Sequence, residues 1–315
     1  MKVDLIIPSS GSESTILKTI KSVAAQDFPI NHIFIINNDQ SEYIKKEVIK
    51  YLLEADIEHS YFIPDRQMGL AEKYNIAINK SLAEIIVTVH SDVVMVGKSE
   101  LRKLINPFFA SENIVAVGHI VEHPIEIWQS YPFYQKCLFS RLLFKEFAGI
   151  DGKFDAFSRV ALAEIGNFDH INFKDAGEDG DVIYRLNTVG LIINSDARII
   201  HLHSLDTSFG LRSYIFKHYQ YARAQGVLLR KCRVKGLKEF IHMFHREVMF
   251  IICLIPDAFL AGATLIIIHG VMYNLNVYKY SWRDYRIFIL PFVHFITIIS
   301  SFYGAILGFA SGKQK

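Results

Sequence analysis

Short apolar runs alternate with longer amphipathic stretches along the N-terminal two thirds of the chain. The apolar runs that have the length of buried strands include residues 3–8, 32–38 and 84–92. Residues 15–26 and 41–55, which follow the first two runs, carry apolar side chains at helical spacing. Strands that alternate with helices of this length predict a mostly parallel sheet with right-handed crossovers. We therefore expect an α/β, Rossmann-like domain over residues 1–210.

Two long apolar stretches follow in the C-terminal third. Val248 to Tyr273 and Ile287 to Phe309 are nearly free of charged residues. At a rise of about 1.5 Å per residue, each could cross a hydrocarbon layer of about 30 Å. Only Pro291 and His294 interrupt the second stretch. Residues 248–315 are therefore predicted to form a two-span membrane hairpin.

The first of these stretches contains Pro256 and Asp257. A carboxylate inside a membrane is costly, and it indicates either a functional site or a broken, re-entrant segment. We expect a kinked span. The alternative is an interfacial helix followed by a short span.

Positive charge gathers just before the first apolar stretch, in residues 211–247. The basic side chains of the approach to the span are Arg223, Arg230, Lys231, Arg233, Lys235, Lys238 and Arg246. Aromatic and leucine residues are interleaved with them, which favours an amphipathic helix on an anionic membrane surface over a solvated basic helix. Because basic segments stay on the cytoplasmic side and no secretory signal is evident at the start, we expect a multi-pass protein of the cell membrane with a cytoplasmic N-terminal domain.

Composition adds little to this picture. The 315 residues are 51% hydrophobic, and the two apolar stretches account for the excess over an ordinary soluble domain. A net charge of +2 says little about partners, and we expect no nucleic-acid partner. Cys137, Cys232 and Cys253 have no paired spacing, which argues against a disulfide framework or a zinc site and fits a reducing compartment.

Polar residues follow three of the predicted strands. They lie at Ser9 to Glu13, Asn37 to Gln40 and His90 to Asp92. In open α/β sheets, ligands bind outside the carboxyl ends of the strands, so these segments are candidate binding residues.

A crowded acidic stretch, AGEDGDVIYRL, spans residues 176–186. Acids favour the first turn of a helix, and apolar residues at helical spacing follow them. Asp181 and Arg185 are placed to form an i,i+4 ion pair. A helix start needs one such acid, so it does not explain why Glu178 and Asp179 are also present.

The order of these segments resembles the family 2 glycosyltransferases of GT-A fold, which transfer a sugar from a nucleotide diphosphate. The resemblance covers roughly residues 1–205. It rests on VDLIIPSSGSES, HIFIINND, MGLAEKYNIAINKSLAEIIVTVHSD, FDAFSRVALAEIGNFD, GEDGDVIYRLNTVG and ARIIHLH. C-terminal spans are similar to those of members that act on lipid-linked acceptors. The Gln-x-x-Arg-Trp motif of the processive polymerases is not found, which favours addition of single sugars.

The resemblance implies a donor site and a divalent metal, Mg²⁺ or Mn²⁺, that neutralises the leaving diphosphate. The matching donor positions are Pro8, Ser9, Glu13, Asn37, Asp39, Gly69, Asn75, His90 and Asp92. Asp92 is the implied metal ligand, with His203, or alternatively His201, as a second ligand. Two positions depart from the family pattern, because His90 and Asn37 each replace an acid.

The resemblance also implies roles in catalysis. Asp179 is the general base that deprotonates the acceptor hydroxyl, and Glu178 positions the acceptor or the base. A helix N-terminus should keep the Asp179 carboxylate ionised. Asp155 and Ser158 are expected to line the acceptor pocket. Trp128 belongs to an aromatic insert that either covers the acceptor or packs as an irregular helical layer.

The sequence therefore predicts a membrane-anchored, inverting glycosyltransferase whose acceptor is a lipid-linked or cell-envelope glycan. Two alternatives stay open. One is a polyprenyl-phosphate sugar synthase, whose acceptor is already an anion and needs no base. The other is an inactive nucleotide-binding membrane module, which the unusual His90 and Asn37 favour and the retained acids and histidines oppose.

Overall fold

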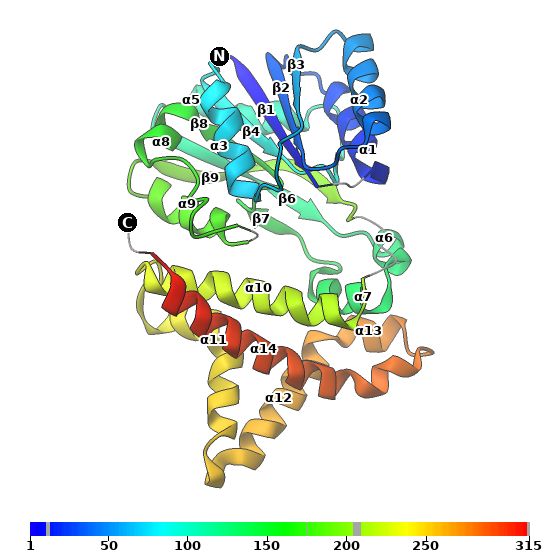
Figure 1. The fold of residues 1–315 in the computed structure, drawn as a ribbon, viewed down its shortest axis with the longest axis vertical. Coiled ribbons are helices and arrows are strands. Elements are labelled where there is room, and N and C mark those ends of the chain that lie inside the picture. Colours follow the sequence, from blue (N-terminus) through cyan, green and yellow to red (C-terminus); the bar gives the residue numbers. More distant parts are fainter. Residues whose placement is uncertain (11–12, 175, 204–208, 314–315) are drawn as a thin grey trace. The chain divides into compact units, whose positions relative to one another are not determined.

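The computed structural model describes residues 1–10, 13–174, 176–203 and 209–313, and the chain divides into two compact units (Figure 1). The first unit comprises Met1–His123 and Glu146–Ser204. The second comprises Pro124–Lys145 and Leu205–Lys315. The insert that contains Trp128 therefore belongs to the same unit as the C-terminal apolar helices.

The first unit is built around a sheet of the order β3-β2-β1-β4-β8-β6-β9-β5, with β7 paired to β6. The strands are β1 (Val3–Ser9), β2 (His32–Asn37), β3 (His59–Phe62), β4 (Ile85–Val89), β5 (Val93–Met95), β6 (Ile114–Glu122), β7 (Phe147–Gly149), β8 (Phe154–Ser158) and β9 (Leu191–His201). Strands β1 to β4 pair in parallel, as predicted. The other half is not mostly parallel, because β8 returns antiparallel to both β4 and β6, and β5 runs antiparallel to β9.

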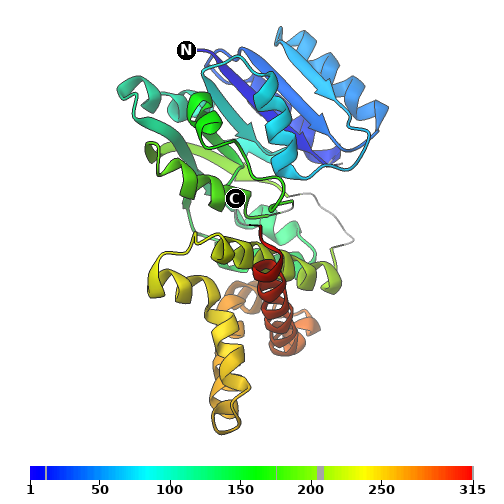
Figure 2. The ribbon, with the colours of Figure 1, turned by 60° about the vertical axis from the view of Figure 1, so that its left-hand side comes forward.

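Helices cover both faces of this sheet (Figures 1 and 2). They are α1 (Glu13–Ala24), α2 (Glu42–Glu54), α3 (Leu70–Lys80), α4 (Glu100–Ile105), α5 (Pro107–Ala110), α8 (Arg159–Glu164) and α9 (Glu178–Leu186). Strand residues alternate between the faces, so Leu5 packs in the core with α1 and α2, while Ile6 packs with α3, α8 and α9. Burial on both faces explains why β1 reads as an unbroken apolar run.

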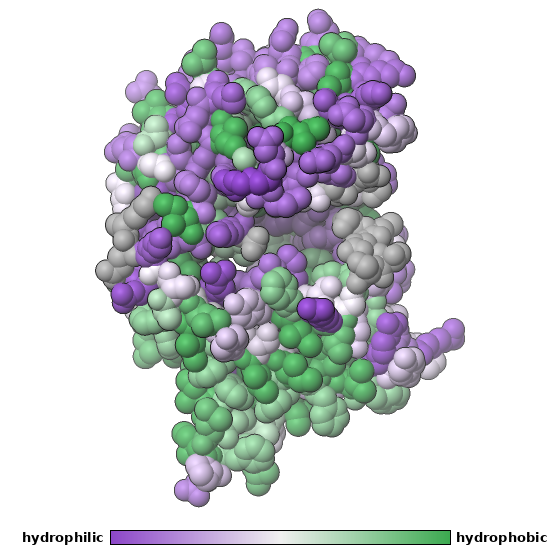
Figure 3. Space-filling model, viewed as in Figure 1, coloured by the Kyte–Doolittle hydropathy of each residue, from purple (hydrophilic) through white to green (hydrophobic). Residues whose placement is uncertain are grey.

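The second unit is helical. Its elements are α6 (Ile125–Ser130), α7 (Phe133–Phe139), η1 (Ser140–Leu142), α10 (Leu211–Arg230), α11 (Gly236–Cys253), η2 (Pro256–Ala258), α12 (Phe259–Tyr273), α13 (Leu275–Tyr280), η3 (Tyr285–Ile289) and α14 (Leu290–Ser311). Two segments are long and apolar enough to cross a membrane, Pro256–Tyr273 and Tyr285–Ser311. Figure 3 shows a predominantly hydrophobic surface on the face of this unit that is in view. These features indicate membrane association.

The prediction of one kinked span from Val248 to Tyr273 is wrong. Helix α11 ends at Cys253, η2 begins at Pro256, and the chain turns back into α12 (Figure 2). Helices α11 and α12 pack against each other. The physical reason is Pro256, which lacks an N–H and is tolerated only in the first turn of a new helix.

Helix α10 packs along α14 through glycines. A Cβ atom added at Gly308 would lie 1.9 Å from the carbonyl oxygen of Arg223, and one added at Gly226 would lie 2.1 Å from that of Ala305. Small residues at four-residue spacing let helix backbones approach closely in membranes, and Gly304 and Gly308 have this spacing. The predicted amphipathic segment is therefore partly buried against the second apolar helix.

We expect Gly308→Ala to destabilise the second unit. A glycine-to-alanine change inside a helix normally stabilises by about 1 kcal/mol, but here the added methyl group would collide with a backbone that cannot move independently. The midpoint of thermal unfolding in detergent should fall by several degrees, as about 1 to 3 kcal/mol of overpacking implies. Gly149→Ala, where a Cβ meets nothing within 4 Å, is the control and should leave the midpoint unchanged. A higher midpoint for Gly308→Ala would contradict the close packing.

Candidate active site

The loop after β1 is held by a buried lysine. Lys73 of α3 is 2% exposed, and its ammonium group donates hydrogen bonds to the carbonyl oxygen of Ser9 and to Oγ of Ser10. Burial lowers the pKa of Lys73 to about 8. The predicted positions Pro8 and Ser9 end β1, whereas the side chain of Glu13 lies outside the described residues. Sequence reasoning missed Lys73, because its partners are more than sixty residues away.

Asn37 is the last residue of β2, and both atoms of its side-chain amide form hydrogen bonds within the protein. Its Nδ2 donates to the Tyr61 hydroxyl at 2.9 Å, and its Oδ1 accepts from the backbone N–H of Asp39 at 3.0 Å. Asn37 is 1% exposed, whereas Asp39 is half-buried and accepts one bond from the Ser41 N–H. Asp39 is thus the more accessible of the two predicted base-binding residues.

Gly69 and Asn75 hold the segment that precedes α9. A Cβ added at Gly69 would lie 2.5 Å from the carbonyl oxygen of Lys174. Asn75 both donates to the carbonyl oxygen of Phe168, at 2.8 Å, and accepts from its N–H, at 3.0 Å. Both residues therefore have structural contacts, and their contact with a donor stays a prediction.

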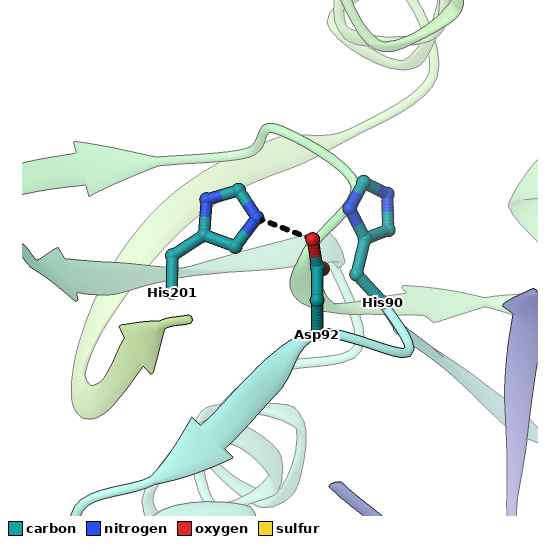
Figure 4. A group of neighbouring side chains, drawn as sticks. All are labelled: His90, Asp92 and His201. Atoms are coloured by element: carbon teal, nitrogen blue, oxygen red, sulfur yellow. Dashed lines mark ion pairs between the residues drawn. The ribbon is translucent and has the colours of Figure 1, made fainter. Parts of the chain in front are cut away.

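Asp92 and two histidines form a candidate metal group (Figure 4). His90 and Asp92 follow β4, and His201 ends β9. Nε2 of His201 lies 3.1 Å from Oδ2 of Asp92, and one ligand atom from each of the three residues lies within 4.8 Å of the others. Nε2 of His90 is buried without a hydrogen-bond partner in the described part of the chain. Imidazole nitrogens and a carboxylate oxygen are donors that fit a divalent cation.

Further histidines surround this group. The His203 ring packs on that of His201 with centroids 3.5 Å apart, and the His123 ring lies 6.4 Å from each of them. His203 lies just past β9 with a φ of 48°, in the left-handed region. Of the two histidines predicted as alternatives for the second ligand, His201 forms an ion pair with Asp92. Sequence reasoning missed His123, which follows β6 more than seventy residues before its neighbours.

The shifted pKa values of His90 and Asp92 favour the protonation states in which imidazole and carboxylate groups bind a cation. Burial lowers the pKa of His90 to about 4, against the opposing effect of Asp92, so the imidazole is neutral near pH 7. Burial would raise the pKa of Asp92, but His201, His90 and His203 outweigh it and hold that pKa below its usual value. A neutral imidazole and an ionised carboxylate are the forms that coordinate metals.

A second polar cluster holds the loop between β7 and β8. Asp155 is 0% exposed, and its Oδ1 accepts from Nδ1 of His119 at 2.8 Å. Its Oδ2 accepts from the backbone N–H groups of Asp151, at 3.0 Å, and Gly152, at 2.6 Å. The Asp155 side chain therefore holds this loop in place and, being buried, does not line an acceptor pocket as we expected.

The loop lies directly beside the metal group. The carbonyl oxygen of Lys153 accepts from the His90 N–H at 3.0 Å, and a Cβ added at Gly152 would lie 3.5 Å from Nε2 of His90. Gly152 has a φ of 82°, which only glycine adopts readily. The side chains of Asp151 and Lys153 form an ion pair on either side of it. Both residues are additions to the predicted site.

Two other predicted acceptor residues have structural roles. Ser158 caps α8, because its Oγ accepts from the Ala161 N–H at 3.4 Å. Trp128 lies in the second unit, 2% exposed, and its Nε1 donates to the carbonyl oxygen of Lys136. It packs in an aromatic layer, which is one of the two possibilities stated for the insert.

The acidic stretch begins α9 after Gly177, whose φ is 88°. The predicted pair is confirmed, since Nε of Arg185 lies 2.7 Å from Oδ2 of the fully buried Asp181. Arg185 also donates to the carbonyl oxygens of Ile165 and Asn167, so this pair ties α9 to the preceding loop. Glu178 is 5% exposed, and Asp179 is half-buried.

Besides the helix N-terminus, the buried surroundings of Asp179 also act on its pKa. Burial raises the pKa of Asp179, and Asp151 and Asp155 raise it further. The N–H of Gly180, at 2.8 Å, and the ammonium group of Lys153 oppose this rise without cancelling it. A carboxyl group with a raised pKa is a better proton acceptor than an ordinary aspartate, provided that it is ionised at the working pH.

The fold of this chain is similar to that of solved structures, one of which is a mannosyltransferase. The chain matches the mannosyltransferase PcManGT from Pyrobaculum calidifontis, solved with GDP-Man and Mn²⁺, with a TM-score of 0.60, 14% identity and coverage of 98% of this chain and 87% of that one. It matches residues 1-349 of TarS from S. aureus, solved with UDP-GlcNAc, with a TM-score of 0.50, 11% identity and coverage of 99% and 91%. At these identities the likeness shows the fold, which is GT-A.

Sequence comparison gives the family. Hyaluronan synthase from Streptococcus pyogenes is 27% identical over 124 residues, which cover 38% of this chain but only 29% of the synthase. The chain thus matches less than a third of the length of this relative. The model of glycosyl transferase family 2 matches residues 4–166, just over half of the chain and most of the sheet described above. The chain therefore belongs to glycosyl transferase family 2, and it is a glycosyltransferase enzyme.

Proposed function

We propose that the protein is a membrane-anchored, inverting glycosyltransferase that moves a sugar from a nucleotide diphosphate to a lipid-linked or cell-envelope glycan. The observation that carries this proposal is the loop Asp151 to Lys153. It contacts His90 of the metal group, and its charges act on Asp179. One loop thus connects a cation site with a candidate base, as sugar transfer from a charged leaving group requires.

His90, Asp92 and His201 would hold a divalent cation, which would supply positive charge to the diphosphate as it leaves. Two imidazoles and one carboxylate suit Mn²⁺ better than Mg²⁺, which prefers oxygen ligands. Mn²⁺ is also the ion in the structure of the similar mannosyltransferase. The His203 ring packs at a tilt against the His201 ring and would fix its orientation.

Asp179 would act as the general base. It takes the proton of the acceptor hydroxyl while that oxygen bonds to the anomeric carbon, and the bond from that carbon to the diphosphate breaks on the opposite side. A direct displacement of this kind inverts the anomeric configuration. Glu178, buried beside Asp179 at the start of α9, would position the acceptor.

The two apolar segments and the basic residues near them support a membrane anchor with the first unit on the cytoplasmic side. Nucleotide sugars are made in the cytoplasm, so this orientation would put the donor site within their reach. The similar protein from Streptococcus pyogenes is by its name a hyaluronan synthase, which supports a glycan as product.

A second candidate is a polyprenyl-phosphate sugar synthase. The specific observation in its favour is a group of buried basic residues in the second unit, His218 and Arg246 among them. A phosphate acceptor is already an oxyanion and needs no base. With polyprenyl monophosphate as acceptor, Asp179→Asn should then keep activity within a few-fold. With a hydroxyl acceptor, the same substitution should lower kcat by about a hundredfold or more. Assaying both acceptors with this variant separates the candidates.

We predict that hydrolysis of the correct nucleotide sugar requires both the metal and Asp92. In detergent-solubilised protein with Mn²⁺, Asp92→Asn should lower the rate of donor hydrolysis by about a hundredfold. The reason is that loss of the carboxylate ligand weakens binding of a cation that stabilises the transition state by several kcal/mol. Asp196→Asn, an exposed acid on the same strand as His201, is the matched control and should hydrolyse the donor normally. Full activity of Asp92→Asn in the presence of a chelator would refute the metal role.

We also predict a shifted acid limb in the pH profile. Asp179 must be ionised to act, so kcat should fall as the pH drops through its pKa, which burial places above the ordinary value of 3.8. Lys153 lowers that pKa, so Lys153→Gln should move the acid limb to still higher pH. Lys98→Gln, an exposed lysine elsewhere in the first unit, should leave the limb in place. An unmoved limb in Lys153→Gln would mean that another group controls it.

A further inference from the structure

Basic and imidazole side chains are buried inside the apolar second unit. His218 of α10 and His294 of α14 are each 1% exposed, and Arg246 of α11 is 9% exposed. His245 of α11 and His269 of α12 lie next to them. Ionisable groups among helices that can cross a membrane are costly, and where they occur they mark binding sites or ion paths more often than packing. The active site described above uses none of these residues.

Hydrogen bonds fix the proton positions along three of the rings when these are neutral. Nδ1 of His245 lies 2.9 Å from the carbonyl oxygen of His242, so this nitrogen carries the proton. Nε2 of His245 must then accept from Nε2 of His269, at 3.1 Å, and Nδ1 of His269 must accept from Nε2 of His294, at 2.8 Å. The chain of bonds ends on Nδ1 of His294, a buried acceptor without a partner among the described residues.

The same reasoning identifies a buried hydrogen-bond donor without a partner, on His218. A guanidinium group can only donate, so Nδ1 of His218 accepts from Nη1 of Arg246 at 2.9 Å, and the proton of His218 is on Nε2. That Nε2–H group is buried without a hydrogen-bond partner in the described part of the chain. No carboxylate of the described residues lies within ion-pair distance of Arg246 either. An uncompensated guanidinium in an apolar unit is costly unless a ligand neutralises it.

The imidazole rings of His218 and His294, which carry the unpartnered donor and acceptor, both lie near one aromatic ring. The ring centroid of Tyr273 lies 6.1 Å from that of His218 and 5.9 Å from that of His294. The guanidinium of Arg141, an exposed side chain, lies over the same ring at 5.9 Å. Helices α12 and α14 make room for this arrangement, because a Cβ added at Gly270 would lie 2.7 Å from the His294 ring.

The charge around His218 is positive. Burial lowers the pKa of His218 well below its usual value, and Arg246, His294, Arg141 and His269 all lower it further. Glu247 is also buried, and neither of its carboxylate oxygens has a hydrogen-bond partner in the structure as described. Its charge raises the pKa of His245, but it is not among the main groups that shift the pKa of His218. An anion is therefore the ligand that the His218 side of the cluster favours.

We propose that Arg141, His218, Arg246 and His294 bind the phosphate group of a lipid phosphate monoester. The monoanionic form of a phosphate monoester offers both a P–OH group and ionised oxygens. The P–OH would donate to Nδ1 of His294, and the ionised oxygens would accept from Nε2–H of His218 and from the guanidinium groups. A phosphodiester has no P–OH and leaves the acceptor on His294 unfilled. This inference rests on the second candidate function, because the phosphate bound here would be that of its polyprenyl-phosphate acceptor.

The test is calorimetric titration of full-length protein in detergent with farnesyl monophosphate. We expect saturable binding, no binding of farnesol, and no binding of the diester phosphatidylglycerol. Inorganic phosphate should compete with farnesyl monophosphate if the phosphate group itself is recognised. Arg141→Gln should weaken binding about tenfold, as the loss of one charge-assisted hydrogen bond implies. Arg283→Gln is the matched control, since Arg283 is also exposed and also lies over an aromatic ring, that of Trp282.

A second measurement does not depend on any variant. In protein labelled with ¹⁵N-histidine, farnesyl monophosphate should shift the Nδ1 resonance of His294 away from that of an unbonded nitrogen. The proposal is overturned if farnesol binds as well as its phosphate, if both arginine variants lose affinity equally, or if the His294 resonance does not move. Donor hydrolysis measured on the same preparation keeps the two proposals apart. Hydrolysis without lipid-phosphate binding defeats this inference alone, and binding without hydrolysis defeats the transferase proposal alone.

Discussion

The active site depends on one buried carboxylate. Asp155 accepts three hydrogen bonds, one from His119 and two from the backbone of the loop that follows β7. Together with the Tyr74 hydroxyl, which donates to the carbonyl oxygen of Gly152 at 3.0 Å, these bonds hold the left-handed turn at Gly152 beside His90. Asp155 is reached from β8, which pairs antiparallel to β4 in register, so the strand that ends at the metal group also aligns the brace for the loop beside it. The mixed half of the sheet is thus what builds the site.

The loop carries the negative charge of Asp151 and the positive charge of Lys153 close to His90 and Asp179, which need different protonation states. In the function that we propose, His90 must be neutral and Asp92 ionised to hold a cation, while Asp179 must exchange a proton during turnover. Burial acts to raise the pKa of both aspartates. Histidines counter it at Asp92, but at Asp179 only Lys153 and one N–H group oppose it, so Asp179 keeps the higher pKa. The two carboxylates differ because of their neighbours, which is how one site can use one acid as a ligand and another as a base.

Local patterns predicted local structure. The period of apolar residues gave the parallel strands β1 to β4, and the spacing of Asp181 and Arg185 gave their ion pair, because both depend on residues a few positions apart. Contacts between distant segments were not predictable in this way. His119 meets Asp155 across 36 positions and Lys73 meets Ser9 across 64, and no spacing rule covers such pairs. Pro256 shows the opposite error, since the helix break was visible in the sequence and we judged it a kink.

The second unit contains segments that are long and apolar enough to cross a membrane, and it also encloses polar side chains. Its helices approach closely where glycines remove side chains, at Gly226 and Gly308 for α10 and α14, and at Gly270 for α12 and α14. Close approach is what brings imidazoles from α11, α12 and α14 into hydrogen-bond contact. A plain anchor would fill the same space with apolar side chains at no desolvation cost. Buried histidines and Arg246 in place of such residues therefore support the phosphate site that we propose in this unit.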